Sequence, residues 1–184
     1  KNALSAEAIQ QDGRAKASAA DPDKGKLVFA KDGNVQRELR YKWDYSVRER
    51  YYYAVVEGTP EPPQSELRDY LLEDSHMNVH VVPEPQGTNY DRGRGGSDPK
   101  LAVTRYQVQQ GNGHHSLLDV QLLTGRKNQI RVHFSEAGHP VVGDVKYGAH
   151  PASRLYLRSV KLRFRHPHTG AWQEVSDRRA EIMV

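Results

Sequence analysis

The chain has 184 residues, a hydrophobic fraction of 36% and a charged fraction of 27%, so we expect one globular domain with a very polar surface. The net charge is only +4, and the absence of cysteine excludes disulfides and thiolate–metal sites. No apolar run approaches the roughly 20 residues that span a bilayer, and the first ten residues lack the apolar core of a secretory signal. We therefore expect a soluble, cytoplasmic protein without membrane contact.

The N-terminal third is predicted to contain a poorly defined start, one short strand and one helix. Residues 1–24 carry few apolar side chains larger than alanine, whereas residues 27–30 have the composition of a short buried strand. A helix is then expected to begin near Gly33. Its apolar face is predicted from residues spaced at i, i+4 and i+8, which are Val35, Leu39 and Trp43.

The middle of the chain alternates between strands and loops. Aromatic and β-branched residues at 51–56 predict a central strand, residues 65–72 a short helical turn, and residues 78–82 a short strand. Residues 83–99 contain three prolines and four glycines and predict a long loop. Residues 101–109 alternate in polarity and predict another strand.

The C-terminal half is predicted to be strand-rich around one helix. The Gly111–Gly113 turn should form a hairpin into a strand at 117–123, and the helix after Gly125 should bury Ile130, Phe134 and Ala137 before it stops at Gly138. We expect three further extended segments, at 140–142, 155–164 with a bulge, and 171–175. The whole pattern predicts an α+β fold with a mainly antiparallel sheet, flanked by a few helices and long loops.

Positive charge is concentrated in the segment at 124–168. It holds nine Lys or Arg residues against two acidic residues, a net of +7, while the whole chain carries +4. Lys161, Arg163 and Arg165 alternate with apolar residues, so all three should lie on the solvent face of one strand. Such a row suits a phosphate backbone, although a simple solvated sheet face is the alternative.

The segment TGRKNQIRVH at 124–133 places cations and amides where a strand turns into a helix. Arginine binds phosphate or carboxylate through two hydrogen bonds, so this segment favours a grip on RNA or another polyanion. The candidate RNA-binding residues here are Arg126, Lys127, Gln129 and His133. The nine histidines of the chain form no helical HExxH motif, and we predict no metal site.

The same segment, followed by GHPVVGD at 138–144 and Tyr147-Gly148, resembles the RluA-type pseudouridine synthases, which modify uridines in ribosomal and transfer RNA. YYAVVEG at 52–58 and the turn at 164–170 fit the same family in the same order. The resemblance covers roughly residues 25–175. It implies the pseudouridine synthase fold, with a catalytic domain at 25–184 and a truncated or degenerate start of that domain at 1–24.

The resemblance also implies a reaction in which the uracil base leaves C1′ of its ribose, turns, and reattaches through carbon, without any cofactor. The family uses an aspartate at the sugar, an arginine that pairs with it and a tyrosine against the base. Carried over, the arginine is Arg131 and the tyrosine is Tyr52. Asp144 also has a family counterpart, and we expect it to hold a turn or to pair with a nearby arginine.

The catalytic carboxylate is the position where this chain departs from the family. The family has Arg-Leu-Asp, two variable residues and Thr-Ser-Gly, whereas residues 19–25 read AADPDKG. We assign the role to Asp21, with Asp23 or no residue as alternatives. Leu157-Arg158-Ser159 also replaces the usual Leu-His-Ala. The alternative function is therefore a catalytically degenerate relative that serves as an RNA-binding module. The target uridine and the oligomeric state cannot be read from the sequence.

Overall fold

The computed structural model of the protein describes residues 33–85, 98–167 and 169–176. The segment expected to be poorly defined at 1–24 and the strand expected at 27–30 lie outside the described residues, as does most of the loop expected at 83–99.

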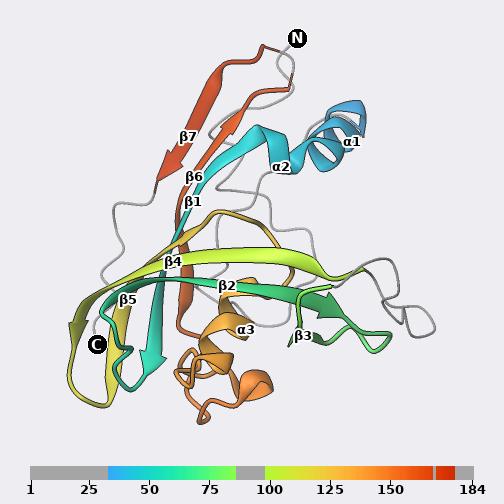
Figure 1. Cartoon of the computed structure of the whole chain (residues 1–184). Coiled ribbons are helices and arrows are strands. Elements are labelled where there is room, and N and C mark those ends of the chain that lie inside the picture. The colour runs from blue at the N-terminus through green and yellow to red at the C-terminus, as the bar shows by residue number, and fades with distance from the viewer. Residues whose placement is uncertain (1–32, 86–97, 168, 177–184) are drawn as a thin grey trace.

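One antiparallel sheet of seven strands dominates the described chain, in the order β3-β2-β4-β5-β1-β6-β7 (Figure 1). Its strands are β1 (Val47–Glu57), β2 (Gln64–Glu73), β3 (Val79–Val82), β4 (Lys100–Gly111), β5 (His115–Leu122), β6 (Leu157–Arg165) and β7 (Trp172–Ser176). The helices are α1 (Gly33–Tyr41), α2 (Trp43–Ser46), α3 (Gln129–Glu136) and the short 3-10 helix η2 (Val145–Tyr147). The predicted α+β class with a mainly antiparallel sheet is confirmed.

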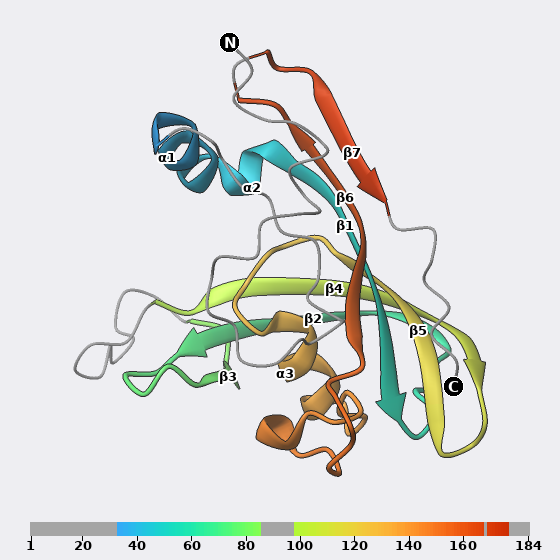
Figure 2. The same cartoon turned by 180° about the vertical axis from the view of Figure 1, so that it is seen from behind.

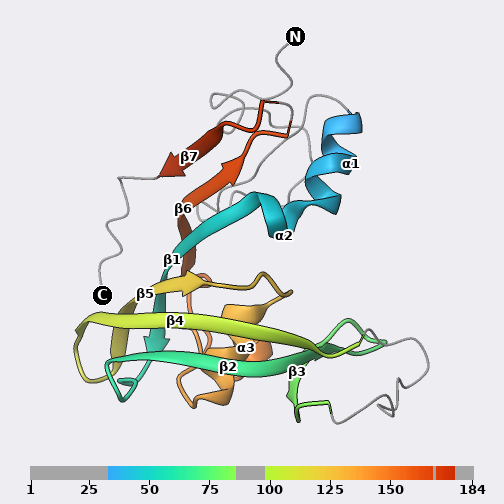
Figure 3. The same ribbon diagram turned by 45° about the horizontal axis from the view of Figure 1, so that its top comes forward.

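The sheet is strongly twisted, so that β6 and β7 at one end cross the direction of β2 and β4 at the other (Figures 1 and 2). Helices α1 and α2 lie beside the end of the sheet that β6 and β7 form, whereas α3 lies beside the other end (Figure 3). The loop that joins β5 to α3 runs between these two groups.

The main core lies between α3 and the sheet. Ile130 and Phe134 pack against β1 and β5 side chains that include Ala54 and Val120, and all four residues are buried. The ring of Phe134 meets Tyr106 of β4 edge to face, with 5.4 Å between the ring centroids. The prediction that Ala137 is also buried was wrong, because it caps the helix and is exposed. The glycine after it, Gly138, has a positive φ of 77° and ends the helix as expected.

The apolar stripe predicted for the N-terminal helix is confirmed. Val35 and Leu39 are buried, and Trp43 packs with Val47, Leu162 and Phe164 in a second core cluster. Two short helices meet at Lys42 in place of one continuous helix, so Trp43 begins α2. No helix in the described ranges is long and apolar enough to cross a membrane.

The helical turn predicted at 65–72 was wrong, since these residues belong to β2. The i, i+4 spacing of Leu67 and Leu71 suits a strand equally well, because both numbers are odd and therefore share one face. Pairing decides the outcome: β2 bonds to β4 on one side and to β3 on the other. Tertiary pairing of this kind overrides weak local helical spacing.

Strand β1 is paired on both sides, with β5 and β6, which confirms it as a central strand. The hairpin predicted at 111–113 is also confirmed between β4 and β5. The bulge expected in β6 lies beside β1: Tyr51 is opposite Lys161 and Tyr52 is opposite Ser159, so Val160 is the extra residue.

Candidate active site

The amide side chain of Gln129 makes several of the hydrogen bonds that hold the loop before α3 in place. Its Oε1 accepts hydrogen bonds from Thr124 Oγ1 at 2.8 Å and from the backbone N–H of Arg126 at 2.9 Å. Its Nε2 donates to the carbonyl of Val103 at 3.0 Å and to Thr104 Oγ1 at 2.9 Å. Because Gln129 is 2% exposed and its amide makes four bonds, it ties the loop to β4.

Helix α3 begins at Gln129, three residues later than Arg126, so Arg126 and Lys127 lie in the loop. The reason is Asn128, whose φ of 53° is left-handed and cannot belong to an α-helix. Arg126 Nε donates to the carbonyl of Leu101 at 3.0 Å, and the ammonium of Lys127 pairs with Glu73 of β2. The predicted placement of these two cations on the helix was therefore wrong.

Tyr52 of β1 faces the side of the sheet that α3 covers, where it packs against the main core cluster. Burial raises the pKa of its hydroxyl, which the charge of Arg50 and a hydrogen bond with Ser159 partly oppose. A half-buried tyrosine with one polar end suits a flat ring contact with a base. Its position is compatible with the predicted role.

Arg50 lies two residues before Tyr52 on the same face of β1 and is only 7% exposed. Its guanidinium lies against Gly125, where an added Cβ would come 1.8 Å from Nη1. None of the sequence motifs described above includes this residue. The signal in the sequence is its spacing, because residues two apart on a strand share one face and Tyr52 is expected to face the site. Arginine is rarely buried on such a face unless it has a partner.

Arg131 is the centre of a second polar cluster. Its Nε and Nη2 donate to the two carboxylate oxygens of Asp144 at 2.6 and 2.7 Å, and Nη1 donates to Asn128 at 3.2 Å. The guanidinium also stacks over the ring of Tyr147 at 4.8 Å. These bonds to Asp144 raise the pKa of Arg131, so the arginine is charged at every accessible pH.

Asp144 has both of the ordinary roles expected for it, the arginine pair and a turn. Its side chain is 1% exposed, and its carbonyl accepts from the N–H groups of Tyr147 at 3.0 Å and Ala149 at 3.1 Å. Asp21, the predicted catalytic carboxylate, and its alternative Asp23 lie outside the described residues. Within the described ranges the carboxylate that Arg131 holds is Asp144.

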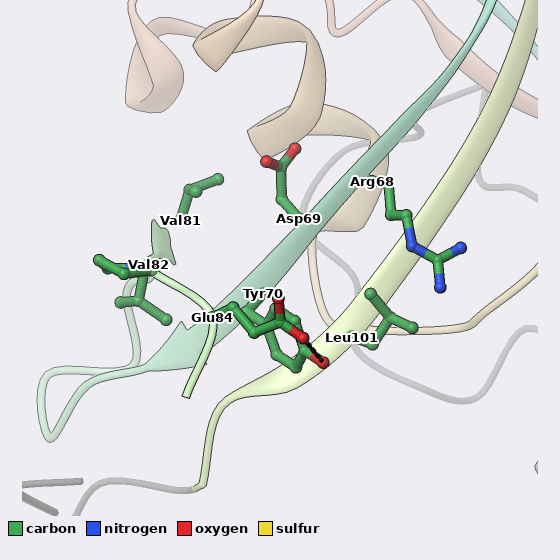
Figure 4. Close-up of a pocket in the computed structure, with 8 residues that line it drawn as sticks. Arg68, Asp69, Tyr70, Val81, Val82, Glu84 and Leu101 are labelled. Atoms are coloured by element: carbon green, nitrogen blue, oxygen red, sulfur yellow. Dashed lines mark hydrogen bonds between the residues drawn. The ribbon is translucent and has the colours of Figure 1, made fainter. Parts of the chain in front are cut away.

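Gln129 and His133 were predicted to contact RNA, but the structure places both side chains in the interior. His133 is 1% exposed; its Nδ1 lies 2.8 Å from Thr104 Oγ1, and its Nε2 lies 3.8 Å from an oxygen of Asp69. Figure 4 shows the Asp69 carboxylate pointing toward the helix. Burial lowers the pKa of His133. Their burial argues against direct RNA contact, and among 124–133 it leaves Arg126 and Lys127 as candidates.

A cavity of about 490 Å³ lies at β2 and β3, beside Asp69 (Figure 4). Tyr70 and Glu84 close one part of it through a hydrogen bond of 3.2 Å. None of the predicted site residues lines it, so it is not the candidate active site.

The predicted cationic row on β6 does lie on the face away from the second core cluster, but it is accompanied by acidic residues. Glu49 of β1 pairs with Lys161 and with Arg163, both at 2.8 Å, and Lys161 also pairs with Glu174. Arg163 and Arg165 stack on Trp172 at 4.9 and 5.0 Å. The charge that this face offers to RNA is therefore smaller than the sequence suggests.

Residues 24–136 match the family described as RNA pseudouridylate synthase, a span that includes Tyr52, Arg50 and Arg131. The chain belongs to that family. A protein of Chloroflexus aurantiacus named as an uncharacterized RNA pseudouridine synthase is 32% identical over an alignment of 154 residues that covers 82% of this chain and 45% of that protein. The dual-specificity RNA pseudouridine synthase RluA of Vibrio cholerae is 30% identical over 149 residues, 79% of this chain and 56% of that protein. The predicted RluA-type resemblance is confirmed.

The fold agrees with a solved pseudouridine synthase structure. The human RNA pseudouridylate synthase domain containing 1 superposes with a TM-score of 0.64 at 24% identity, covering 83% of this chain and 63% of the human one. The chain spans about half the length of the curated relatives it matches.

Proposed function

We propose that this chain isomerises uridine to pseudouridine in RNA. The observation that carries the proposal is the family match, which spans both the strand with Tyr52 and the helix with Arg131. Its relatives include proteins named for the ribosomal large subunit and for tRNA, so we propose ribosomal or transfer RNA as the substrate. An enzyme that acts on a stacked base must extrude it, and a buried polar site beside a cationic loop suits that task.

The proposed roles follow the family pattern. Tyr52 stacks on the extruded uracil, Asp21 acts at the ribose carbon, and Arg131 stabilises the carboxylate in its charged form. Asp144 and Asn128 fix the guanidinium of Arg131 through three of its five N–H groups. A guanidinium held in this way is oriented before substrate binds, which supports a positioning role for Asp144.

The decisive assay incubates the chain with uridine-containing fragments of ribosomal and transfer RNA and detects pseudouridine as a carbodiimide-stable adduct. Wild type should modify one position in one of these RNAs, and Asp21→Ala should abolish the product. Asp23→Ala serves as the matched control two residues away and should retain activity. Full activity of Asp21→Ala would remove Asp21 from the mechanism, and loss in Asp23→Ala alone would transfer the role to Asp23.

A non-catalytic RNA-binding role is the second candidate function. The observation that favours it is the pairing of Arg131 with Asp144, combined with the altered sequence at residues 19–25 and at Arg158. This role predicts salt-dependent RNA binding without any pseudouridine in the assay above. Product formation by wild type would exclude it.

A further inference from the structure

A cleft of about 420 Å³ opens between α1–α2 and the loop that precedes α3. Aromatic residues line one wall, and cations line the opposite wall. The aromatic residues are Tyr41, Trp43 and Tyr45, and the cations are Lys100, Arg126 and Lys127. Leu71 and Val79 contribute an apolar floor. In Figures 1 and 3, α1 and α2 lie on the side of the end of β2 and the start of β4.

The two tyrosines are unusually open to solvent. Tyr41 is 93% exposed and Tyr45 is 81% exposed, although Val35 and Leu39 on the inward face of α1 are buried. Neither tyrosine ring is therefore packed in the hydrophobic core. Large aromatic side chains that gather at one exposed site usually mark a binding surface.

The cations on the opposite wall favour a negatively charged molecule, single-stranded nucleic acid, as the ligand of the cleft. Lys100 is exposed at the start of β4, and Lys127 is exposed in the loop, where Glu73 balances it. Three cations stand against two acidic lining residues, Glu73 and Asp98. Aromatic platforms combined with cations are the recognition chemistry of unpaired nucleic acid, because every base has a face that stacks and every phosphate is negative.

The cleft adjoins the candidate active site through one residue. Gly125 lines the cleft, and its backbone lies against the guanidinium of Arg50. Arg50 in turn lies on the same face of β1 as Tyr52, and its charge acts on the Tyr52 hydroxyl. A strand that occupies the cleft would thus run directly beside the site where the target base is proposed to bind.

We propose that this cleft binds the unpaired nucleotides that flank the target uridine, with their bases on Tyr41 and Tyr45 and their phosphates at Lys100 and Lys127. The inference rests on the proposed function for the identity of the RNA target. The binding itself does not require that the chain be catalytic.

Trp43 provides a direct reporter, because the chain has only two tryptophans and the other, Trp172, lies on β7. In the Trp172→Phe variant of this chain, a fluorescein-labelled oligouridylate of about ten nucleotides is titrated. Emission of Trp43 should be quenched with the same midpoint that fluorescence anisotropy of the RNA reports. Unchanged Trp43 emission while anisotropy shows saturation would overturn the proposal.

Substitution of the tyrosines tests the stacking contact. Tyr41→Ala and Tyr45→Ala should each weaken binding of the single-stranded oligonucleotide by about fivefold or more, since stacking on one ring contributes at least that much. Tyr41→Phe and Tyr45→Phe keep the ring and should bind like wild type. Equal affinity of the Ala and Phe variants would contradict the proposal, and circular dichroism confirms that each variant is folded.

A matched pair of cations tests the other wall. Lys127 and Arg105 are 46% and 58% exposed, and each pairs with one glutamate of β2. Only Lys127 lines the cleft. Lys127→Ala should weaken binding and reduce its salt dependence by about one counterion, whereas Arg105→Ala should change neither. Equal effects of the two substitutions would count against the cleft.

The pseudouridine assay separates this inference from the proposed function. If wild type forms pseudouridine while Tyr41→Ala and Tyr45→Ala change neither RNA binding nor turnover, the proposed role of the cleft is rejected and the proposed function is retained. If wild type forms no pseudouridine but its RNA binding depends on both tyrosine rings, the proposed role of the cleft is supported and the proposed function is rejected.

Discussion

The guanidinium of Arg50 lies so close to Gly125 that no side chain fits between them. A Cβ on Gly125 would lie 1.8 Å from Nη1, far inside any normal contact distance. A side chain at position 125 would therefore require either the arginine or the loop to shift.

Gly125→Ala should therefore destabilise the protein by about 1–3 kcal/mol, because the loop or the arginine must move to relieve the overlap. Urea unfolding measures this change. Gly33→Ala is the matched control, since nothing lies within 4 Å of the added Cβ and its φ is not positive. It should be neutral or slightly stabilising. Equal destabilisation by both substitutions would show that the contact with Arg50 is unimportant.

Removal of Arg131 should be costly because it leaves the Asp144 carboxylate buried without its cation. We expect Arg131→Met to lower the free energy of unfolding by about 3 kcal/mol or more. The double variant Arg131→Met/Asp144→Asn removes both charges and should recover part of that loss. Chemical denaturation of the two single variants and the double variant gives the coupling energy. Strict additivity would mean that the pair contributes no mutual stabilisation.

Protonation of His133 should destabilise the fold at mildly acidic pH. Burial lowers its pKa in the native state, although the charge of Asp69 opposes this effect. The unfolded chain has an ordinary histidine pKa of about 6.5 and therefore binds more protons than the native chain below that pH. Stability is complete above about pH 6.5 and declines as the pH falls toward the lower native pKa.

Urea titrations between about pH 7.5 and pH 5 measure this decline. His133→Gln should flatten the pH dependence, because it removes the buried titrating group. His80→Gln changes an exposed histidine on β3 and should leave the slope as it is in wild type. An unchanged slope in His133→Gln would assign the acid sensitivity to other groups.

Glu49 should limit RNA binding at the outer face of β6, since its pairs with Lys161 and Arg163 lower its own pKa and keep it negative. If this face contacts RNA, Glu49→Gln should strengthen binding and steepen its salt dependence, because Arg163 and Lys161 each lose an ion pair, although Lys161 keeps the one with Glu174. Filter binding over a range of salt concentrations measures both quantities.

Glu66→Gln is the matched control for Glu49→Gln. Glu66 of β2 also contacts two arginines, Arg68 and Arg105, and both of them are more than half exposed. The control should leave RNA affinity unchanged if binding depends on β6. A similar increase in both variants would indicate a general effect of net charge, and no change in either would remove the β6 face from the RNA interface.

Most of the fold could be predicted because its signals are local. Residues 51–56 consist of side chains that favour a strand, and Gly111 to Gly113 forms a turn whatever surrounds it. The error at 65–72 has the opposite cause. Spacing that fits both a helix and a strand is resolved only by the partners β3 and β4, which lie elsewhere in the sequence.

The site could be predicted only in part, for a related reason. The motif predicts Arg131 and Tyr52 as site residues, which stays a prediction, whereas the expected pairing of Asp144 with an arginine is confirmed. The motif could not reveal that Gln129 and His133 face inward, because their burial depends on Thr104 of β4. Arg50 and the cleft beside Gly125 likewise depend on contacts between distant segments, which a linear pattern does not record.

The extra residue in β6, Val160, lies in a bulge opposite Tyr51 and Tyr52, and its two neighbours in the strand face different sides of the sheet. In a regular strand, Ser159 and Lys161 would point to the same side of the sheet. Val160 is inserted between them, so Ser159 is directed to the side of Tyr52 while Lys161 is directed to the side of Tyr51. One strand therefore supplies a hydroxyl to the half-buried Tyr52 and a row of charged side chains to the opposite surface. Without Val160, Ser159 and Lys161 would be neighbours in a regular strand and would keep these sides, so the bulge adds one buried apolar side chain without moving either surface.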